Sequence, residues 1–450
     1  GRIEEATDSY KKALSLKPDY VQVYNNLGVL YKDNEKYENA IKMFMKAKEL
    51  QPDHQNSYYN LALIKKEQGL NEEAIELLLK VIDLNPAHSE AKLLLTTTSN
   101  ELGIKFHKEG NHKSALKYFK VVIILEPTDH LAFFNVGNTY LELEDFKNAK
   151  AHFEKALRLE PKYEPALFNY GLALINSADF EKGWRYFEYR WKVSPQNEVV
   201  WPIQDTALWK GERGKRVALW KEQGIGEDII FLSLLPEVKE MCAALSVFVD
   251  PRLQTLCRQG RPDIIFVKDI EVLLKGECDY LLPLGSVPGL IRNDISDFDR
   301  TVRGYLKADP VRVEAIRKEL KLKGKTVIGV SWKSFKTKYK TKSVQLKDME
   351  RIFSGLDVVL VNLQYGDVED EIREFKEATG IDVVQCASVD NREDLDGLAA
   401  LIEVCDLVVS ITNVTVHLAG ALAKETWVLL PYVPNFWWGS DRPDTIWYTS

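Results

Sequence analysis

The stretch Leu407 to Leu430, LVVSITNVTVHLAGALAKETWVLL, joins a short apolar run, a polar turn and a second run of small and apolar residues. It predicts a buried strand at 407–411, a turn at 412–415, a helix at 416–423 and another strand from Thr426. A helix that begins directly after a buried strand presents unpaired backbone N–H groups and the positive end of its dipole. We therefore expect a phosphate-binding turn, with these candidate residues: Thr412, Asn413, Thr415 and His417.

The bulk composition is that of a multidomain globular protein. A chain of 450 residues with 45% apolar content is long enough for about three domains. A net charge of -7 argues against nucleic acid or an anionic membrane as a partner. No apolar run approaches the length of a membrane span, so we expect a cytoplasmic protein. The start at Gly1 and the abrupt end suggest a piece of a longer protein.

Six prolines in the first half define a repeat with spacings of 34, 34, 41, 34 and 34 residues: Pro18, Pro52, Pro86, Pro127, Pro161 and Pro195. Small residues recur 24 and 12 residues before these prolines, where they allow paired helices to approach closely. This pattern resembles the tetratricopeptide repeat and covers residues 1–198. The 41-residue interval predicts an extended helix near residues 89–95.

A polar row is expected along the concave groove of such an array. Two residues before the first small position of successive repeats stand Asn26, Asn60, Glu101, Asn135 and Asn169. Stacked side-chain amides can donate to and accept from an extended peptide backbone. Glu101 interrupts the row, and asparagine can also occupy this position without any role in binding.

The last repeat differs from the others in its aromatic residues, within GWRYFEYRW at 183–191. A repeat array that ended in solvent would need a polar cap. We therefore expect this end to be docked on the next domain.

From Arg216 onward, short apolar runs alternate with helical patterns, which predicts parallel sheets with crossover helices. A connector at 199–215 leads to one α/β domain at 216–310 and another at 311–450. We expect strands at 217–220, 245–249, 264–267, 327–332, 358–363 and 382–385, with one helix at 228–242. Two such units in tandem place the carboxyl ends of their strands on the two sides of a cleft.

A glycine turn with two carboxylates follows the first of these strands. Gly224 and Gly226 permit close approach of a ligand, and Glu227 and Asp228 stand at the expected helix start. Either carboxylate could act as a general base, or both could simply cap the helix. The turn lacks the third glycine of a dinucleotide-binding fingerprint, so a nicotinamide site is disfavoured.

Polar residues also follow the strands of the second α/β unit. Lys333 ends one strand, where its ammonium group would suit a diphosphate leaving group. The residues at 336–342 form a basic and hydroxyl-rich run, which is either a loop over the cleft or a solvated charge run. Gln364, in the segment that ends the next strand, could contact a base or ribose, or could belong to a simple turn.

Two other chemistries fit the sequence less well. Aspartates with one residue between them can indicate a metal site. Asp394 and Asp396 fit a helix cap better, and we expect no metal. Asp297 and Asp299 form a similar pair. A Ser/His/Asp hydrolase is poorly supported, because His417 is the only histidine after His152 and no G-x-S-x-G elbow exists.

Several segments together resemble bacterial proteins that fuse tetratricopeptide repeats to a glycosyltransferase module of the GT-B fold. They are GWRYFEYRW, EQGIGEDIIF, GVSWK, VNLQYGD, DLVVSITNVTVHLAGALAKETWVLLP and FWWGSDRPDTIWY. Such proteins are related to heptosyltransferases, protein O-GlcNAc transferase and flagellin glycosyltransferases. The resemblance implies a repeat superhelix followed by two Rossmann-like domains across a cleft, with 216–310 on the acceptor side and 311–450 on the nucleotide-sugar side.

The resemblance also assigns roles to residues. Glu227 would be the base where relatives usually carry aspartate, with Asp228 as the alternative, and Lys333 would meet the donor phosphates. Thr412 stands where many relatives have aspartate and Asn413 where they have threonine. His417 and the Leu-Ala-Gly after it match the relatives.

We therefore predict a metal-independent transferase that moves a sugar from a UDP-, CMP- or ADP-linked donor to a protein hydroxyl presented by the repeat groove. No cofactor is expected to be permanently bound. Two alternatives stay open: a catalytically degenerate repeat scaffold for protein–protein interaction, and a transferase that acts on a glycan or lipid.

Overall fold

The computed structural model describes residues 2–193, 207–222, 224–275, 278–322, 324–334, 343–430 and 445–448. The chain divides into two compact units, Gly1–Ala166 and Leu167–Ser450. The first unit ends before residue 198, because the last helices of the repeat array belong to the same unit as the α/β sheets.

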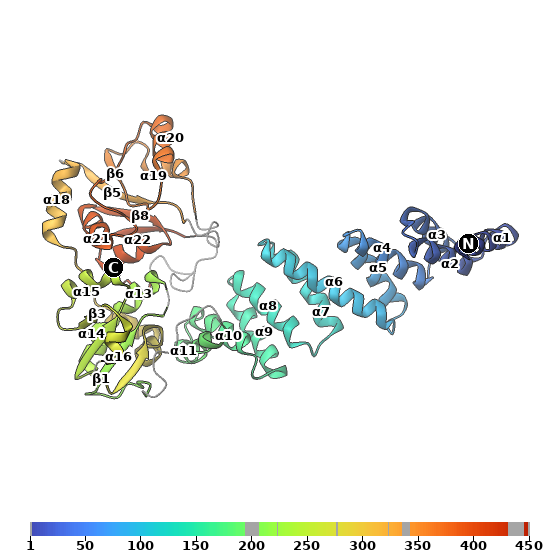
Figure 1. Cartoon of the computed structure of the whole chain (residues 1–450), viewed down its shortest axis with the longest axis horizontal. Helices are drawn as coiled ribbons and strands as arrows, with labels where there is room; N and C mark the ends of the chain where they lie inside the picture. Colours follow the sequence, from blue (N-terminus) through green and yellow to red (C-terminus); the bar gives the residue numbers. More distant parts are fainter. Residues whose placement is uncertain are drawn as a thin grey trace. The chain divides into compact units, whose positions relative to one another are not determined.

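The first unit is a row of antiparallel helix pairs (Figure 1). Its helices are α1 (Arg2–Leu16), α2 (Val21–Lys32), α3 (Tyr37–Leu50), α4 (Gln55–Glu67), α5 (Asn71–Leu84), α6 (Ser89–Lys108), α7 (His112–Leu125), α8 (His130–Glu142), α9 (Phe146–Leu159) and the start of α10 (Glu164–Asn176). Helix α6 has 20 residues, whereas α4 and α8 have 13 each. The predicted helix extension in the 41-residue interval is thus confirmed.

Glycine at the first small position of a repeat lets a phenylalanine ring of the second helix reach the backbone. A Cβ atom on Gly28 would lie 2.6 Å from the Phe44 ring, and one on Gly137 would lie 2.6 Å from the Phe153 ring. Both phenylalanines are fully buried. The close approach predicted from the small residues is therefore present, and a larger side chain would force the helix pair apart.

The last helices of the array pack on the α/β part of the second unit. They are α10, α11 (Phe180–Phe187) and α12 (Arg190–Val193). Trp184 is buried, and its indole N–H donates to the Arg292 carbonyl at 2.7 Å. Phe180 lies with its ring 5.0 Å from that of Phe298. The expected docking of the aromatic end of the array is confirmed.

Two parallel sheets form the rest of the second unit. In the first, the strand order is β3-β2-β1-β4, with β1 (Arg216–Trp220), β2 (Ala244–Phe248), β3 (Ile265–Val267) and β4 (Tyr280–Pro283). In the second, the order is β7-β6-β5-β8-β9, with β5 (Thr326–Ser331), β6 (Val358–Asn362), β7 (Val383–Val384), β8 (Leu407–Ile411) and β9 (Thr426–Leu429). Strands run outward from β1 and from β5 in both directions, as in doubly wound α/β sheets.

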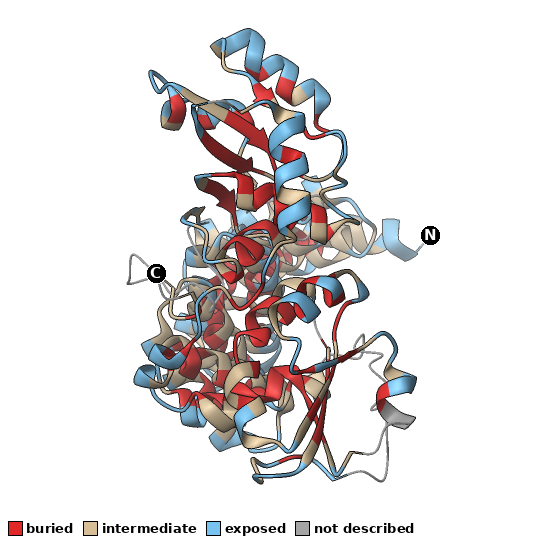
Figure 2. Ribbon diagram, turned by 90° about the vertical axis from the view of Figure 1, so that its left-hand side faces the viewer, coloured by how far each residue is buried: buried red, intermediate tan, exposed pale blue. Residues whose placement is uncertain are grey.

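Helices cover both faces of each sheet, and the strands are largely buried (Figure 2). In the first half they are α13 (Ile225–Leu232), α14 (Leu235–Met241), η1 (Pro251–Leu253), α15 (Gln254–Gly260), α16 (Ile270–Lys275), η2 (Leu284–Ser286), α17 (Pro288–Ile291) and η3 (Ile295–Arg300). In the second half they are α18 (Pro310–Leu320), η5 (Leu346–Met349), α19 (Glu350–Phe353), α20 (Glu369–Thr379), α21 (Leu395–Val404) and α22 (Val414–Ala421). One continuous apolar cluster joins the aromatic end of the array to the facing layers of both sheets.

Three details differ from the sequence-based prediction. The expected helix at 228–242 is two helices, α13 and α14, because Pro236 stands at the start of the second and cannot continue the first. Strand β4 was not predicted from the sequence. Helix α22 begins at Val414 instead of Val416, because Asn413 caps it.

In the part of the chain that the structure describes, none of the helices is both long enough and apolar enough to span a membrane.

Candidate functional site

The carboxyl ends of β8, β5 and β6 are linked by a chain of polar side chains. Asn413 caps α22 by accepting from the Thr415 N–H at 3.0 Å, and its amide donates to Ser331 Oγ at 2.7 Å. Ser331 Oγ–H in turn donates to Gln364 Oε1 at 3.1 Å. Asn413 therefore fixes the first turn of α22 against the neighbouring strand, and the remaining N–H groups of that turn lie at this edge of the sheet.

Gln364 organises the end of β5. Its buried Oε1 also accepts from the backbone N–H groups of Trp332 at 3.0 Å and Lys333 at 2.9 Å. Its Nε2 donates to the Tyr365 carbonyl at 3.1 Å. The side chain predicted to meet a base or ribose thus holds the loop that carries Lys333.

Lys333 forms an ion pair with Glu371 of α20. The same carboxylate accepts from the indole N–H of Trp332 at 2.6 Å. The Lys333 side chain is 19% exposed and that of Glu371 is 39% exposed. The cation therefore lies at the sheet edge beside a carboxylate that sequence reasoning did not single out.

The other residues of the predicted phosphate-binding turn lie close by. Thr415 is buried at the start of α22, and His417, two residues later in the same first turn, is 8% exposed. Thr412 Oγ1 is buried without a hydrogen-bond partner in the described part of the chain. An unsatisfied buried hydroxyl is uncommon in native proteins and marks a place where a ligand or water would bond.

His417 brings the two α/β halves together. A Cβ atom on Gly226 would lie 3.0 Å from His417 Cδ2, so the imidazole rests directly on the backbone of the glycine turn. The Nδ1 atom of His417 lies 3.0 Å from the Tyr448 hydroxyl. The first turns of α13 and α22 therefore meet at this contact. Only glycine fits at position 226 without a shift of the His417 ring.

Glu227 and Asp228 follow this contact in the first turn of α13. A Cβ atom on Gly224, the N-cap of that helix, would lie 2.9 Å from Glu227 Oε2, so the carboxylate folds back over the helix start. Glu227 is half-buried, whereas Asp228 is 1% exposed. Of the two predicted bases, Glu227 is the one that a solute can reach.

Asp228 belongs to a buried cluster of charges. Lys221 Nζ lies 3.7 Å from Asp228 Oδ2 and 3.3 Å from Asp250 Oδ2. Burial raises the pKa of Asp228 to about 7 despite the Lys221 charge. Burial would also raise the pKa of Asp250, but hydrogen bonds from Arg252 and the charge of Lys221 lower it to about 2. The cluster therefore holds one carboxyl group that ionises near neutral pH.

A polar pocket of about 330 Å³ opens at the ends of β6 and β7. Its lining residues are Asn362, Gln364, Tyr365, Gly366, Gln385, Cys386, Val389, Asp390, Asn391 and Arg392. The Asn391 amide donates to the carbonyls of Asn362 at 3.1 Å and Gln364 at 3.2 Å, which closes one wall. The pocket adjoins the loop that carries Lys333.

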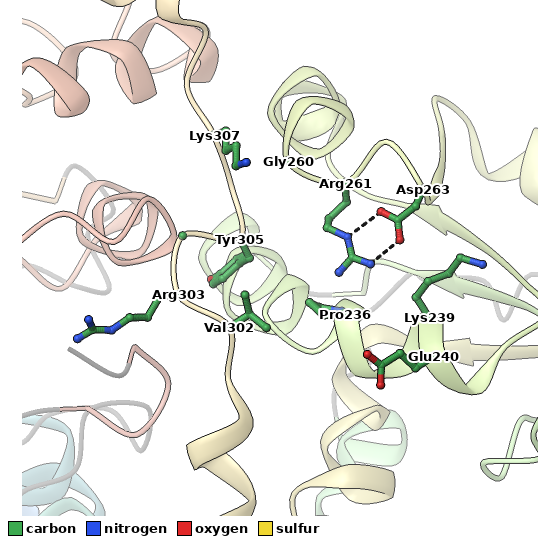
Figure 3. A pocket seen from close by; sticks show the side chains of 11 residues that line it. Pro236, Lys239, Glu240, Gly260, Arg261, Asp263, Val302, Arg303, Tyr305 and Lys307 are labelled. Atoms are coloured by element: carbon green, nitrogen blue, oxygen red, sulfur yellow. Dashed lines mark hydrogen bonds and ion pairs between the residues drawn. The ribbon is translucent and has the colours of Figure 1, made fainter.

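A second pocket of about 670 Å³ lies between α14 and the segment that connects the two sheets (Figure 3). Its charged lining includes Lys239, Lys307 and the ion pair of Arg261 with Asp263. The Tyr305 side chain forms part of its wall and donates from its hydroxyl to the Ile229 carbonyl at 2.8 Å. None of the predicted site residues lines this pocket.

Two of the four aspartates considered as metal ligands, Asp394 and Asp297, have structural partners. Asp394 caps α21 by accepting from the Gly397 N–H at 2.9 Å, and it pairs with Arg312 of α18. Asp297 closes a capping box at η3. Within the described ranges no group of three or more His, Cys, Asp or Glu residues could hold a metal ion. The basic run at 336–342 lies outside the described residues.

Comparisons with known proteins identify the repeats of the first unit over two ranges. Residues 1–35 match a model described as TPR repeat, and residues 19–87 and 130–163 match models described as tetratricopeptide repeat. These helices are tetratricopeptide repeats. Protein FlbA of Caulobacter vibrioides is 31% identical over 243 residues, covering 49% of this chain. The alignment covers 40% of FlbA, so the chain spans less than half the length of this relative.

The comparison with solved structures found repeat proteins as well. YrrB, a TPR protein with an unusual peptide-binding site, is 20% identical with a TM-score of 0.29, covering 42% of this chain and 94% of YrrB. A TPR repeats protein from Bacteroides fragilis is 18% identical with a TM-score of 0.33, covering 38% of this chain and 90% of that protein.

The asparagine row lies on the first helices of the tetratricopeptide repeats. Asn60 donates from its amide to Asn25 of the preceding repeat at 3.2 Å, and Asn135 donates to Asn100 at 3.4 Å. Asn26 is exposed, and Asn169 is half-buried on α10. Part of the row therefore ties one repeat to the next, which sequence spacing alone did not indicate.

Proposed function

We propose that this protein is a glycosyltransferase of the GT-B type, which moves a sugar from a nucleotide-linked donor to a hydroxyl on a protein. The observation that carries the proposal is the contact of His417 with Gly226. It brings the glycine turn with Glu227 to the helix start at Asn413, at the carboxyl ends of two parallel sheets. Ligands of doubly wound sheets bind at such ends.

In the proposed reaction the acceptor hydroxyl attacks the anomeric carbon of the donor sugar. The bond from that carbon to the phosphate oxygen breaks, and the nucleotide leaves with the electron pair. Glu227 takes the hydroxyl proton, because it is the accessible carboxylate of the turn. The first turn of α22 and the Lys333 ammonium stabilise the negative charge on the departing phosphate.

The donor would lie along the edge of the second sheet. Its phosphates would reach the α22 start, where the unsatisfied Thr412 hydroxyl can donate to a phosphate oxygen. Its base would occupy the polar pocket beside Gln364 and Asn391. The donors to test are UDP-, CMP- and ADP-sugars.

Isothermal titration calorimetry of the whole chain with these three donor classes tests the proposal. Binding of one class, with sugar transferred to protein in a radiolabel assay, is the expected result. A pure repeat scaffold would bind none of them, and that outcome would exclude the transferase.

Lys333 and Glu371 provide a sharper test, since the proposal gives their substitutions different effects although the two side chains form one ion pair. Lys333→Ala removes the phosphate contact and should slow transfer by about 30- to 1000-fold. Glu371→Gln keeps an acceptor for the Trp332 indole but releases Lys333 and removes a negative charge near the phosphates. The affinity of the Glu371→Gln variant for the nucleotide product, measured with UDP, CMP and ADP, should therefore rise or stay unchanged.

Equal losses of nucleotide affinity in the two variants would contradict this assignment. They would mean that the Lys333–Glu371 pair only supports the loop. Urea unfolding of both variants serves as the control, because a partly exposed pair contributes little to stability.

The repeat groove is proposed to present the protein acceptor. Alanine at both Asn135 and Asn169 should lower transfer to protein by roughly tenfold, since two amide hydrogen bonds to the peptide are lost. Transfer to a free glycan should not change. Asn148→Ala on α9 is the matched control, because Asn148 is exposed on a second helix and bonds only locally to Asp145. An equal loss with a glycan acceptor would point to the alternative acceptor class.

A further inference from the structure

A buried arginine of the last repeat helix reaches the loop at the end of β1. Arg190 of α12 is 3% exposed and forms a two-pronged bond with Glu222, with Nε–Oε2 at 3.0 Å and Nη2–Oε1 at 2.8 Å. The side chain of Glu222 is 1% exposed. Two parallel N–H to O bonds fix both the distance and the orientation of the carboxylate.

The same arginine holds a second loop, at the end of the adjacent strand β4. Arg190 Nη2 also donates to Ser286 Oγ at 2.7 Å, and Ser286 Oγ–H donates to Glu188 at 3.0 Å. A Cβ atom on Gly285 would lie 2.1 Å from Glu222 Oε1, so only glycine leaves room for the carboxylate. The loops after β1 and β4 are therefore joined through one guanidinium group.

Glu222 stands two residues before Gly224, the N-cap of α13. The backbone on either side is ordered by the bonds from the Lys221 N–H to the Phe248 carbonyl and from the Asp228 N–H to the Gly224 carbonyl, both at 3.0 Å. Glu222 thus lies between the end of β1 and the N-cap of α13, close in sequence to the turn that carries Glu227.

We propose that Arg190 is a positioning residue for the glycine turn, so that the end of the repeat array forms part of the transfer site. This inference rests on the proposed function, in which Glu227 of that turn serves as the base. Arg190 does not touch the reacting atoms. It acts through Glu222, by holding the start of α13 at the contact with His417.

The alternative is that Arg190 only neutralises the buried charge of Glu222. Replacing both members of a buried pair with apolar residues of similar volume is often neutral for stability, whereas removing one is destabilising. The double variant Arg190→Met/Glu222→Met therefore separates positioning from charge compensation, because it leaves no buried charge unpaired and no bond between α12 and the turn. Glu188, which also pairs with Arg190 at 2.8 Å, has a side chain that is 47% exposed, so water solvates its charge in the variant.

Hydrogen exchange of the full chain, followed by mass spectrometry, measures the turn directly. In Arg190→Met, exchange of the Lys221 and Asp228 amides should quicken at least tenfold, while the amides of β8 keep their rates. The double variant should unfold at nearly the wild-type urea concentration yet keep the fast exchange. Arg190→Lys retains the charge but not the two-pronged geometry, so its exchange rates should lie between those of the wild type and Arg190→Met.

Arg216→Met is the matched control. Arg216 stands at the other end of β1 and pairs with Asp279 at 3.0 Å, with both side chains partly exposed. Its substitution should leave exchange at Lys221 and Asp228 unchanged. Slow exchange in the double variant would overturn the proposal, as would an unchanged rate in Arg190→Met.

Calorimetry with UDP, CMP and ADP keeps this inference separate from the proposed function. Arg190→Met should bind the same nucleotide as the wild type within about twofold, because the donor edge lies on the second sheet, and should lose transfer at least tenfold. If the wild type binds none of the three, the proposed transferase fails. The exchange rates still decide whether Arg190 positions the turn.

Discussion

Replacing Trp184 with alanine is expected to lower the free energy of unfolding of the Leu167–Ser450 unit by about 3 to 5 kcal/mol. Trp184 is buried where the repeat array meets the α/β sheets, with its ring 5.7 Å from Phe187 and 6.4 Å from Trp447. The alanine variant would leave a cavity and an unpaired Arg292 carbonyl. Both losses destabilise the folded state.

Urea unfolding followed by tryptophan fluorescence is a suitable measurement, because all ten tryptophans lie between residues 184 and 447. The signal therefore reports the second unit and not the earlier repeats. Trp184→Phe should lower the free energy of unfolding less, by about 1 to 2 kcal/mol, since it mainly removes the hydrogen bond to the Arg292 carbonyl. Trp427→Ala is the control: Trp427 is 55% exposed on β9, so its loss should stay within about 0.5 kcal/mol. A loss below 1 kcal/mol for Trp184→Ala would contradict the docking.

The repeats could be predicted from sequence because their physics is local. Each pair of helices repeats the same close approach, so the spacing of prolines and small residues reports it directly. The longer α6 followed from a single irregular interval. Most strands of the α/β unit were also predictable from their apolar runs. Strand β4 was not predicted, and Pro236 was not recognised as the start of a new helix.

The candidate site was predicted less completely, because its contacts join residues far apart in the chain. The glycine turn and the α22 start were recognised as ligand-binding patterns, but nothing local indicated that His417 rests on Gly226. Glu371 pairs with Lys333 across 38 residues, and Glu222 pairs with Arg190 across 32. A charged residue that a sequence pattern predicts to be exposed can be buried and paired in the fold. Only the tertiary structure shows which charged residues are paired.

Asp228→Asn should make the second unit more stable at pH 8, by at most about 4 kcal/mol, and should have almost no effect near pH 4. The reason is that the pKa of Asp228 is about 7 in the folded chain and 3.8 for an ordinary aspartate. Between these two values the folded state binds more protons than the unfolded state. Wild-type stability due to this group therefore falls by about 1.4 kcal/mol for each pH unit from about 4 to 7.

Asp250→Asn is the matched comparison, because it should act in the opposite direction. Its pKa is lowered to about 2, so the ionised group stabilises the fold above pH 4, and that stability is lost as the pH falls toward 2. At pH 8 its substitution should cost about 2 kcal/mol. Lys221 keeps one carboxylate partner in either variant.

Urea unfolding of both variants between pH 4 and 8.5, again by tryptophan fluorescence, measures the two effects. Changes of opposite sign in the free energy of unfolding at pH 8 would mean that burial dominates the pKa of Asp228. They would also mean that the bonds to Arg252 dominate the pKa of Asp250. If Asp228→Asn instead destabilised the unit at pH 8, the buried carboxylate would be held by its attraction to Lys221 after all. Asp228 would then be ionised at neutral pH, and Glu227 would share its helix turn with a second negative charge.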